Sequence, residues 1–336
     1  MSFTSEAVKH IMELKGSIKK VSIVVITYEH EKFIRQTLDS IVSQKTNFDF
    51  ELIIAEDFSP DKTRSICEEF AEQYPAVVRL LPSDRNYGAM SNFIRAIYAC
   101  TGKYIAMCEG DDYWIDDQKL QKQFDFMEAN PDFTLCFTGV EVIDEMGWNK
   151  DSTHFWPNPV KDEFTIEDVI LSEMSIAPTP TIFFKNVLPN PLPDFYANAL
   201  AGDMGIQLFA AEKGKLKYLA GKMAVYRNHS GGMTKTKESI EKGNTALLKF
   251  FMDFNEYSGY KYADVFRKRL LANAKTQLIF GARDKKGIGR LQHYFKRMPD
   301  YLKYSNKVDL KEFIYFHVIL FAPFILKLFP GKNNGQ

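Results

Sequence analysis

Residues 102–114, GKYIAMCEGDDYW, join a short apolar run to an acidic turn. Residues 104–108 have the length and composition of a buried strand, and Gly102 separates them from a helical pattern upstream. The run ends in Glu109-Gly110-Asp111-Asp112, whose carboxylate oxygens suit Mg²⁺ or Mn²⁺. An ion held there would neutralise charge that builds on a diphosphate leaving group. A solvated acidic turn is the alternative interpretation.

Three more strand-like runs lie upstream, at residues 21–28, 50–55 and 77–81, and a helical pattern follows each of them. Ser59-Pro60-Asp61 is predicted to open the second of these helices, with a side-chain cap and proline in the first turn. Strands that alternate with helices indicate βαβ crossovers. The sequence therefore predicts an α/β fold with a largely parallel sheet.

The pattern loosens after residue 115. We expect helices at 119–129 and 202–213, strands at 133–142, 181–185 and 217–226, an irregular insertion at 144–164, and helix from about 236 onward.

Polar side chains follow three of the predicted strands. They are Thr27-Tyr28-Glu29, Glu56-Asp57 and the acidic turn at 109–112. Ligands of such sheets bind outside the carboxyl ends of the strands, so these clusters predict a site at one rim. Asp57 can accept a hydrogen bond from a nucleotide base or ribose. Alternatively, it forms an Asx-type turn with Ser59.

Three residues further along have two interpretations each. Asp203 follows Gly202 at the start of a predicted helix, where Asp is a preferred N-cap residue, and a role in the site is the other interpretation. His229, in the segment YRNHSGG at 226–232, is either a structural hydrogen-bonding residue or a metal ligand. Trp114 directly follows the acidic motif and is either an apolar surface of the site, which for a glycosyltransferase would be a floor for an acceptor sugar, or part of the core.

Taken in order, these segments resemble family 2 glycosyltransferases, which have the GT-A fold. The resemblance covers about residues 21–235. It rests on VSIVVITYEHEKFIRQTLDSI, EDFSPDKT, NYGAMSNF, GKYIAMCEGDDYW, GDMGIQLFA and YRNHSGG. No single piece is decisive, but their order and spacing together are specific.

The resemblance implies a nucleotide pocket lined by Thr27, Tyr28 and Glu29, with Tyr28 near the base. It implies that Asp57 contacts the base, typically uracil, and that Asn86 and its neighbours close over the donor. Glu29 stands where the family commonly has Asn. The contact made by Glu29 is therefore in doubt.

For the chemistry, the resemblance implies that residues 109–111 are the metal-binding Asp-x-Asp element. Asp111 is then the surest ligand, and Asp112 faces the donor sugar or the metal. Glu109 replaces the usual first Asp, which puts its direct coordination in doubt. Asp203 would be the catalytic base, and His229 would complete the metal site or contact the diphosphate.

The carboxyl-terminal part of the chain is basic. Residues 261–336 hold 16 Lys and Arg against 5 Asp and Glu, although the whole chain has 43 of each. Residues 313–329, FIYFHVILFAPFILKLF, are apolar and aromatic but too short for a membrane span. They predict peripheral contact with an anionic membrane surface. A helix that packs on the catalytic domain or on a second subunit is the alternative.

We therefore predict a helical extension at 1–20, a GT-A catalytic domain at 21–235 and a helical region at 236–336 with a membrane-associating tail. The expected enzyme is an inverting glycosyltransferase that uses Mn²⁺ or Mg²⁺. It would move a sugar from a nucleoside-diphosphate sugar, most simply a UDP-sugar, to a glycan or lipid-linked glycan in polysaccharide biosynthesis.

Two alternatives for the function remain. One is a degenerate homologue that binds a nucleotide-sugar without turnover. The other is a sugar nucleotidyltransferase, which is disfavoured because residues 28–32 hold no glycine-rich phosphate loop.

The four cysteines form no Cys-x-x-Cys pair and no secretory signal is visible. We accordingly expect a cytoplasmic protein, peripheral on the inner face of the cell membrane. No nucleic-acid module accompanies the dispersed basic residues, so no nucleic-acid partner is expected. The oligomeric state stays open.

Overall fold

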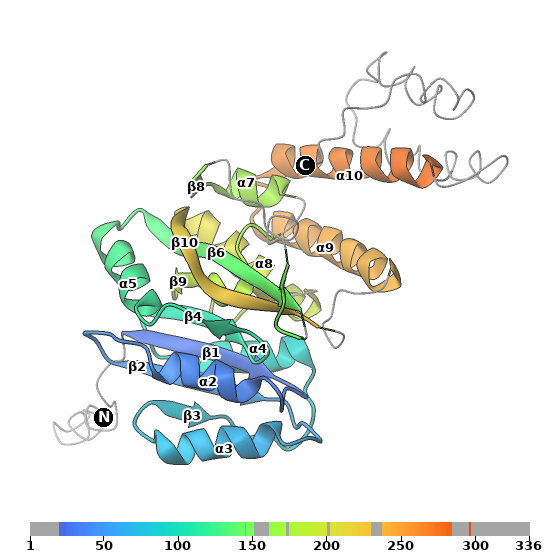
Figure 1. Cartoon of the computed structure of the whole chain (residues 1–336). Helices are drawn as coiled ribbons and strands as arrows, with labels where there is room; N and C mark the ends of the chain where they lie inside the picture. Colours follow the sequence, from blue (N-terminus) through green and yellow to red (C-terminus); the bar gives the residue numbers. More distant parts are fainter. Residues whose placement is uncertain are drawn as a thin grey trace, which may run out of the picture. The chain divides into compact units, whose positions relative to one another are not determined.

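The structure is a computed structural model and describes residues 20–144, 146–150, 161–172, 175–199, 202–229, 237–283 and 296. The chain divides into two compact units, residues 1–250 and 251–336. The first unit carries the sheet (Figure 1). The predicted extension at 1–20 lies outside the described residues except for Lys20, and the domain limits at 235 and 236 stay predictions.

Within the described residues, one mixed sheet has the order β3-β2-β1-β4-β9-β6-β10-β5, with β7 paired to β6 and β8 to β10. Strands β3, β2, β1 and β4 are parallel neighbours, and β6 is parallel to β10. The strands are β1 (Val21–Thr27), β2 (Phe50–Glu56), β3 (Val78–Leu80), β4 (Tyr104–Glu109), β5 (Tyr113–Trp114), β6 (Phe133–Asp144), β7 (Asn149–Lys150), β8 (Glu163–Phe164), β9 (Phe183–Lys185) and β10 (Lys215–Asn228).

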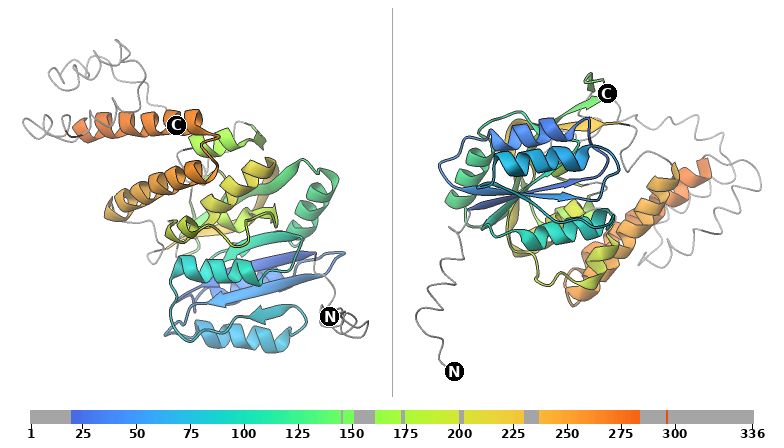
Figure 2. Two further views of the ribbon diagram at one scale, coloured as in Figure 1. Left: turned by 180° about the vertical axis from the view of Figure 1, so that it is seen from behind. Right: turned by 90° about the horizontal axis from the view of Figure 1, so that it is seen from below.

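Helices cover both faces of the parallel strands. Figure 2 shows α2 and α3 on one face and α4 on the other. This two-sided cover explains why β1 and β2 are buried along nearly their whole length and are mostly apolar rather than alternating. The helices of the first unit are α2 (Ile34–Val42), α3 (Thr63–Gln73), α4 (Ala89–Ala99), α5 (Lys119–Ala129), α7 (Ile166–Leu171), α8 (Gly202–Lys213) and the 3₁₀ turns η1 (Thr179–Thr181) and η2 (Asp194–Asn198).

The pairing register brings the predicted polar clusters to one edge. Thr27 pairs with Glu56, and the neighbouring Ile26 pairs with Glu109. Strands β4 and β6 are both antiparallel to β9 and hence parallel to each other. The carboxyl ends of β6 and β10 therefore lie at the same edge as those of β1, β2 and β4. This confirms the α/β prediction and the shared rim.

The expected start of the second helix is wrong. Helix α3 begins at Thr63, and its N-cap, Lys62, makes no side-chain cap hydrogen bond. The carboxylate of Asp61 instead accepts the backbone N–H groups of Thr63, at 3.0 Å, and of Glu31, at 3.2 Å. Residues 59–61 therefore form a loop tied to the one after β1.

Two other elements differ from the prediction. The short strand β5 was not expected, and it pairs antiparallel with β10. Strand β10 is longer than predicted and contains register shifts near Gly221, which has a φ of 107°. Within the expected insertion at 144–164, β7 pairs with β6 and β8 pairs with β10, over two residues each. Residues 151–160 lie outside the described part.

The helical region begins with α9 (Lys237–Tyr257), whose last residues belong to the second unit together with α10 (Ala263–Arg283). In that unit the ring of Phe266 packs against Phe251 and Phe254, with centroids 5.7 and 6.3 Å away. Among the described residues, no helix is both long enough and apolar enough to cross a membrane. The tail at 313–329 lies outside the described residues.

Candidate functional site

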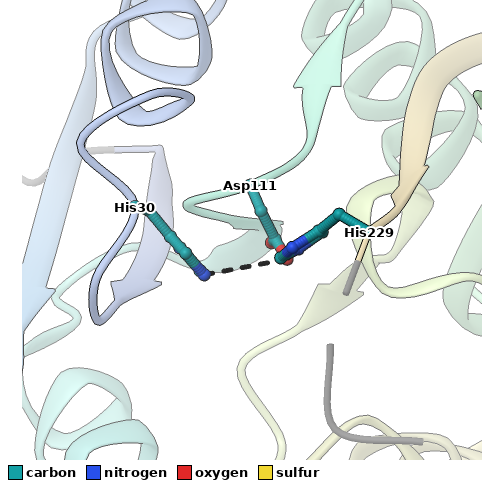
Figure 3. Close-up of side chains that lie close together, drawn as sticks. All are labelled: His30, Asp111 and His229. Carbon is teal, nitrogen blue, oxygen red and sulfur yellow. Dashed lines mark hydrogen bonds and ion pairs between the residues drawn. The ribbon is translucent and has the colours of Figure 1, made fainter. Parts of the chain in front are cut away.

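Asp111 lies at the centre of a group of side chains from three segments. Its Oδ2 is 2.8 Å from Nε2 of His229 and 3.8 Å from Nε2 of His30 (Figure 3). His30 comes from the loop after β1, Asp111 from the turn after β4, and His229 directly follows β10. One ligand atom from each of the three lies within 4.8 Å of the others.

Asp111 also belongs to a second potential metal-binding group. One carboxylate oxygen from each of Glu109, Asp111 and Asp112 lies within 4.8 Å of the others. Asp112 is buried, and its Oδ1 accepts the backbone N–H of Arg227 at 2.8 Å. Within the described residues its Oδ2 is buried without a hydrogen-bond partner. A buried oxygen of this kind needs a proton or a cation, so the residues fit a divalent ion.

The backbone of the acidic turn is held from two sides. From α2, the buried hydroxyl of Thr37 donates to the carbonyl oxygen of Asp112 at 2.6 Å. From β10, the guanidinium of Arg227 donates to the carbonyl oxygen of Asp111 and to the side chain of Gln36. The turn is thereby fixed before any ligand arrives, as pre-organised binding requires.

Gly110 allows this turn to approach β1 closely. A Cβ at position 110 would lie 2.3 Å from Oγ1 of Thr27 and 2.9 Å from Nδ1 of His30. Thr27 is itself buried and lies 3.2 Å from the same ring nitrogen of His30. Only glycine fits here, and Thr27 contributes by positioning His30.

The pKa values of the three carboxylates, those of Glu109, Asp112 and Asp111, shift in different directions. Burial, together with repulsion from Asp111 and Asp203, raises the pKa of Glu109 to about 8. Burial also raises the pKa of Asp112 well above its usual range. For Asp111 burial acts in the same direction, but the hydrogen bond from His229 and the charges of both histidines outweigh it and lower the pKa. Asp111 is therefore the carboxylate best prepared to bind a cation.

Asp57 organises the loop after β3. Its two carboxylate oxygens accept the backbone N–H groups of Tyr87 at 2.7 Å and of Gly88 at 2.9 Å. The side chain of Asn86 also accepts the N–H of Gly88, at 2.9 Å. The Asx-turn interpretation is not what the structure shows, since the N–H of Ser59 binds Glu56 instead. Asp57 and Asn86 thus lie side by side, both bound to the backbone N–H of Gly88.

Tyr28 and Glu29 form the exposed part of the same rim. The Tyr28 ring is 40% exposed, and the hydrogen bond to Glu29 is the main cause that raises the pKa of its phenol. The N–H of Glu29 donates to Oγ of Ser59 at 3.0 Å. The loops after β1 and β2 are therefore joined beside Asp57.

Asp203 lies in the first turn of α8, which begins at Gly202. Its carboxylate accepts backbone N–H groups of this first turn, including that of Met204, and residues 200 and 201 lie outside the described part. Burial raises the pKa of Asp203, and a hydrogen bond with Ser175 opposes that effect. Its charge also contributes to the raised pKa of Glu109, so the two carboxylates lie near each other.

Trp114 belongs to the core. It is 4% exposed, and its indole N–H donates to the carbonyl oxygen of Pro180 at 2.8 Å. The ammonium of Lys119 lies 4.2 Å from its ring centroid. Of the two interpretations left open by the sequence, the structure therefore supports the core one.

His30 belongs to the site but was not predicted from the sequence. Its signal was its place directly after the Thr27-Tyr28-Glu29 cluster, at the same rim as the acidic turn. A lone histidine in a loop does not reveal that β1 and β10 bring it and His229 to opposite sides of Asp111. The two imidazole centroids are 6.1 Å apart.

Comparison with known proteins identifies the family of this chain. The family model described as glycosyl transferase family 2 matches residues 22–188, about half of the chain. An uncharacterized protein of Mycobacterium tuberculosis is 37% identical over 213 residues, which are 63% of this chain and 60% of that protein. The dTDP-rhamnosyl transferase RfbG of Shigella flexneri is 37% identical over 108 residues, 31% of this chain and 37% of that protein.

The chain thus spans only about 60% of the length of its mycobacterial relative. Among solved structures, TarS 1–349 of Staphylococcus aureus in complex with UDP-GlcNAc has a TM-score of 0.61 at 17% identity, covering 85% of this chain and 81% of that one. At this identity the likeness concerns the fold alone. The family match and the likeness in fold agree: the chain belongs to glycosyl transferase family 2 and has the GT-A fold.

Proposed function

We propose that this protein is an inverting, metal-dependent glycosyltransferase that moves a sugar from a nucleoside-diphosphate sugar to a glycan or lipid-linked glycan acceptor. The observation that carries the proposal is the position of Asp111. Its carboxylate is shared by the acidic group with Glu109 and Asp112 and by the pair of histidines, at the carboxyl rim of the parallel strands. Nucleotide ligands of open α/β sheets bind at this rim.

Mn²⁺ or Mg²⁺ is the cation that this donor set suits, because the group is dominated by carboxylate oxygens. Asp111 would hold it, with Glu109, Asp112 or His229 as further ligands and His30 beside them. Once bound, such an ion supplies positive charge to the departing diphosphate. The protein contributes a turn that Thr37 and Arg227 already hold in place.

The donor side of the site is formed by the loops after β1, β2 and β3. We assign Thr27, Tyr28, Glu29, Asp57 and Asn86 to the nucleotide. A pyrimidine nucleotide is the favoured donor, since TarS was solved with UDP-GlcNAc and the Shigella relative is named a dTDP-rhamnosyl transferase. A UDP-sugar is the first choice, with a dTDP-sugar as the other outcome to test.

Asp203 is assigned the role of general base. An acceptor hydroxyl is a weak nucleophile until its proton is removed, and the pKa that burial raises makes this carboxylate a stronger base. The acceptor oxygen attacks the anomeric carbon while the bond from that carbon to the diphosphate oxygen breaks. The hydroxyl proton passes to Asp203 and the electron pair leaves on the diphosphate. One displacement of this kind inverts the anomeric carbon.

Donor hydrolysis and transfer test the proposal. Purified protein is incubated with UDP-, dTDP- and GDP-sugars and Mn²⁺, with and without chelator and with candidate glycan acceptors. We expect nucleoside diphosphate release from one donor, lost on chelation and reduced at least about 100-fold in Asp111→Asn. Asp117→Asn, an exposed carboxylate paired with Lys45, is the matched control and should retain full activity.

Two results would contradict the proposal. Activity that survives both chelation and Asp111→Asn would show that the reaction does not need a metal held by Asp111. Nucleotide-sugar binding without turnover, with every acceptor offered, would instead indicate the degenerate homologue that binds its ligand without reaction.

The acceptor class and the location of the protein rest on the basic, apolar tail. We propose that residues 313–329 hold the protein peripherally on an anionic membrane surface, where lipid-linked glycans are found. A chain ended at residue 308 should remain in the supernatant when cell membranes are sedimented, whereas the full chain should sediment with them. A shortened chain that stays fully with the membranes would contradict this part of the proposal.

A further inference from the structure

Phe58 combines a costly backbone conformation with an exposed aromatic ring. Its φ is 59°, in the left-handed region that bulky residues rarely adopt, and the side chain is 55% exposed. Burial in the core therefore does not account for a phenylalanine here. Glycine would take the same backbone conformation at no steric cost.

The surrounding contacts fix the backbone on both sides of Phe58. The N–H of Asp57 donates to the carbonyl oxygen of Thr27 at 3.0 Å, which extends the β1–β2 ladder by one residue. The N–H of Ser59 donates to Oε1 of Glu56 at 2.6 Å, and Oγ of Ser59 accepts the N–H of Glu29. These bonds involve no atom of the Phe58 ring, so the turn does not depend on that ring.

A second residue with a left-handed backbone lies in the neighbouring loop, after β1. Among the described residues, three non-glycine residues have a left-handed φ, and two of them, Glu29 and Phe58, lie in the joined loops after β1 and β2. The third, Tyr260, lies in the turn after α9 of the second unit. Backbone strain that the surrounding structure maintains is found preferentially at ligand-binding positions.

Phe58 also lies beside the residues assigned to the nucleotide. It directly follows Asp57, which is buried and binds the loop at 86–88. Across the ladder, Tyr28 supplies a second exposed ring. Two accessible aromatic surfaces thus lie on the strand ends around one buried carboxylate. A heterocyclic base needs this combination, since it offers a π-face for stacking and edge groups for hydrogen bonds.

We propose that the ring of Phe58 is a stacking surface for the base of the nucleotide donor, and that this contact is why the strained phenylalanine is present. The inference rests on the proposed function and extends it by one binding residue. Stacking of this kind stabilises the ground state and the transition state equally. Its loss should therefore raise KM for the donor and leave kcat nearly unchanged.

Four proteins test the inference: the wild type, Phe58→Gly, Phe58→Asn and Phe58→Tyr. Glycine and asparagine both tolerate the left-handed conformation and remove the ring, whereas tyrosine keeps it. The dissociation constant of UDP is measured by calorimetry in the presence of Mn²⁺, with dTDP and GDP as further probes. Thermal unfolding of each protein is recorded alongside.

We expect UDP to bind about 10-fold more weakly to Phe58→Gly and Phe58→Asn, and within about threefold of the wild type to Phe58→Tyr. The melting temperature of Phe58→Gly should stay level or rise, because the backbone strain is relieved. A purely structural role would instead lower the melting temperature and leave the dissociation constant unchanged.

Two negative results are distinguishable. If the wild type binds UDP and Phe58→Gly binds it within about twofold, the inference on Phe58 is overturned while the proposed function stands. If the wild type binds none of UDP, dTDP and GDP, the proposed function is overturned and this inference with it.

Discussion

Lys119 is a fully buried lysine outside the candidate site. Its ammonium donates to Oε1 of Gln123 at 2.7 Å and faces the ring of Trp114, while Gln123 in turn donates to the carbonyl oxygen of Thr181. Burial lowers the pKa of Lys119 to about 8, and the charge of Asp116 opposes this shift. The folded protein therefore carries a desolvated cation at neutral pH.

This arrangement predicts a pH-dependent stability. The unfolded chain keeps the proton of Lys119 up to its ordinary pKa of about 10.4, whereas the folded chain releases it near pH 8. Between these values the unfolded state binds more protons, so the contribution of Lys119 to stability rises with pH. Relative to Lys119→Met, the wild type should gain up to about 3 kcal/mol between pH 7 and 10.

Urea unfolding of both proteins at pH 7, 8.5 and 10 measures this difference. The methionine variant serves as the reference for the wild type. The other titrating groups are common to the two chains, so their contributions to the difference in stability largely cancel. Parallel pH profiles would show that the lysine keeps its proton throughout and that burial does not shift it.

At the scale of single residues, the sequence indicated which side chains gather at the rim but not the contacts that they make. Asp111 was identified because carboxylates after a buried strand suit a metal, and the structure gives it a lowered pKa and two histidine neighbours. His30 was missed and Trp114 stayed ambiguous for the same reason. Their roles depend on partners more than 60 residues away, Asp111 for one and Pro180 for the other.

At the scale of elements, the strands were predictable and the loops between them were not. Buried β-branched runs identify β1 and β2, since both faces of these strands are covered. The late start of α3 follows from contacts between loops. The N–H of His30 donates to Oγ1 of Thr63 at 2.8 Å and that of Lys62 to Glu31 at 3.1 Å. These bonds compete with the helical cap that the local sequence suggests.

Strands β5 and β10 illustrate the same limit. β5 has only two residues, Tyr113 and Trp114, and exists as a strand because it pairs with Val225 and Ala224 of β10. Two-residue runs carry no periodic signal, so tertiary pairing alone reveals them. This pairing joins the acidic turn to the strand that ends next to His229.

At the scale of the whole molecule, the first unit accounts for the family assignment, because the matched residues 22–188 lie entirely within it. The alternation of strands and helices was enough to predict its fold, and the shared carboxyl edge of its strands was enough to predict one site rather than several. The basic region from residue 261 onward carries no such alternation. The membrane contact proposed for this region rests on its charge and its hydropathy.

We propose that Asp111 holds a divalent cation at this rim together with the diphosphate of the donor. The most direct measurement is anomalous diffraction at the manganese edge from crystals of the protein with Mn²⁺ and UDP. We predict one strong anomalous peak within coordinating distance of the Asp111 carboxylate, bridging to the diphosphate and absent in Asp111→Asn. Bound UDP with no manganese near Asp111, or manganese held elsewhere in the chain, would contradict the account.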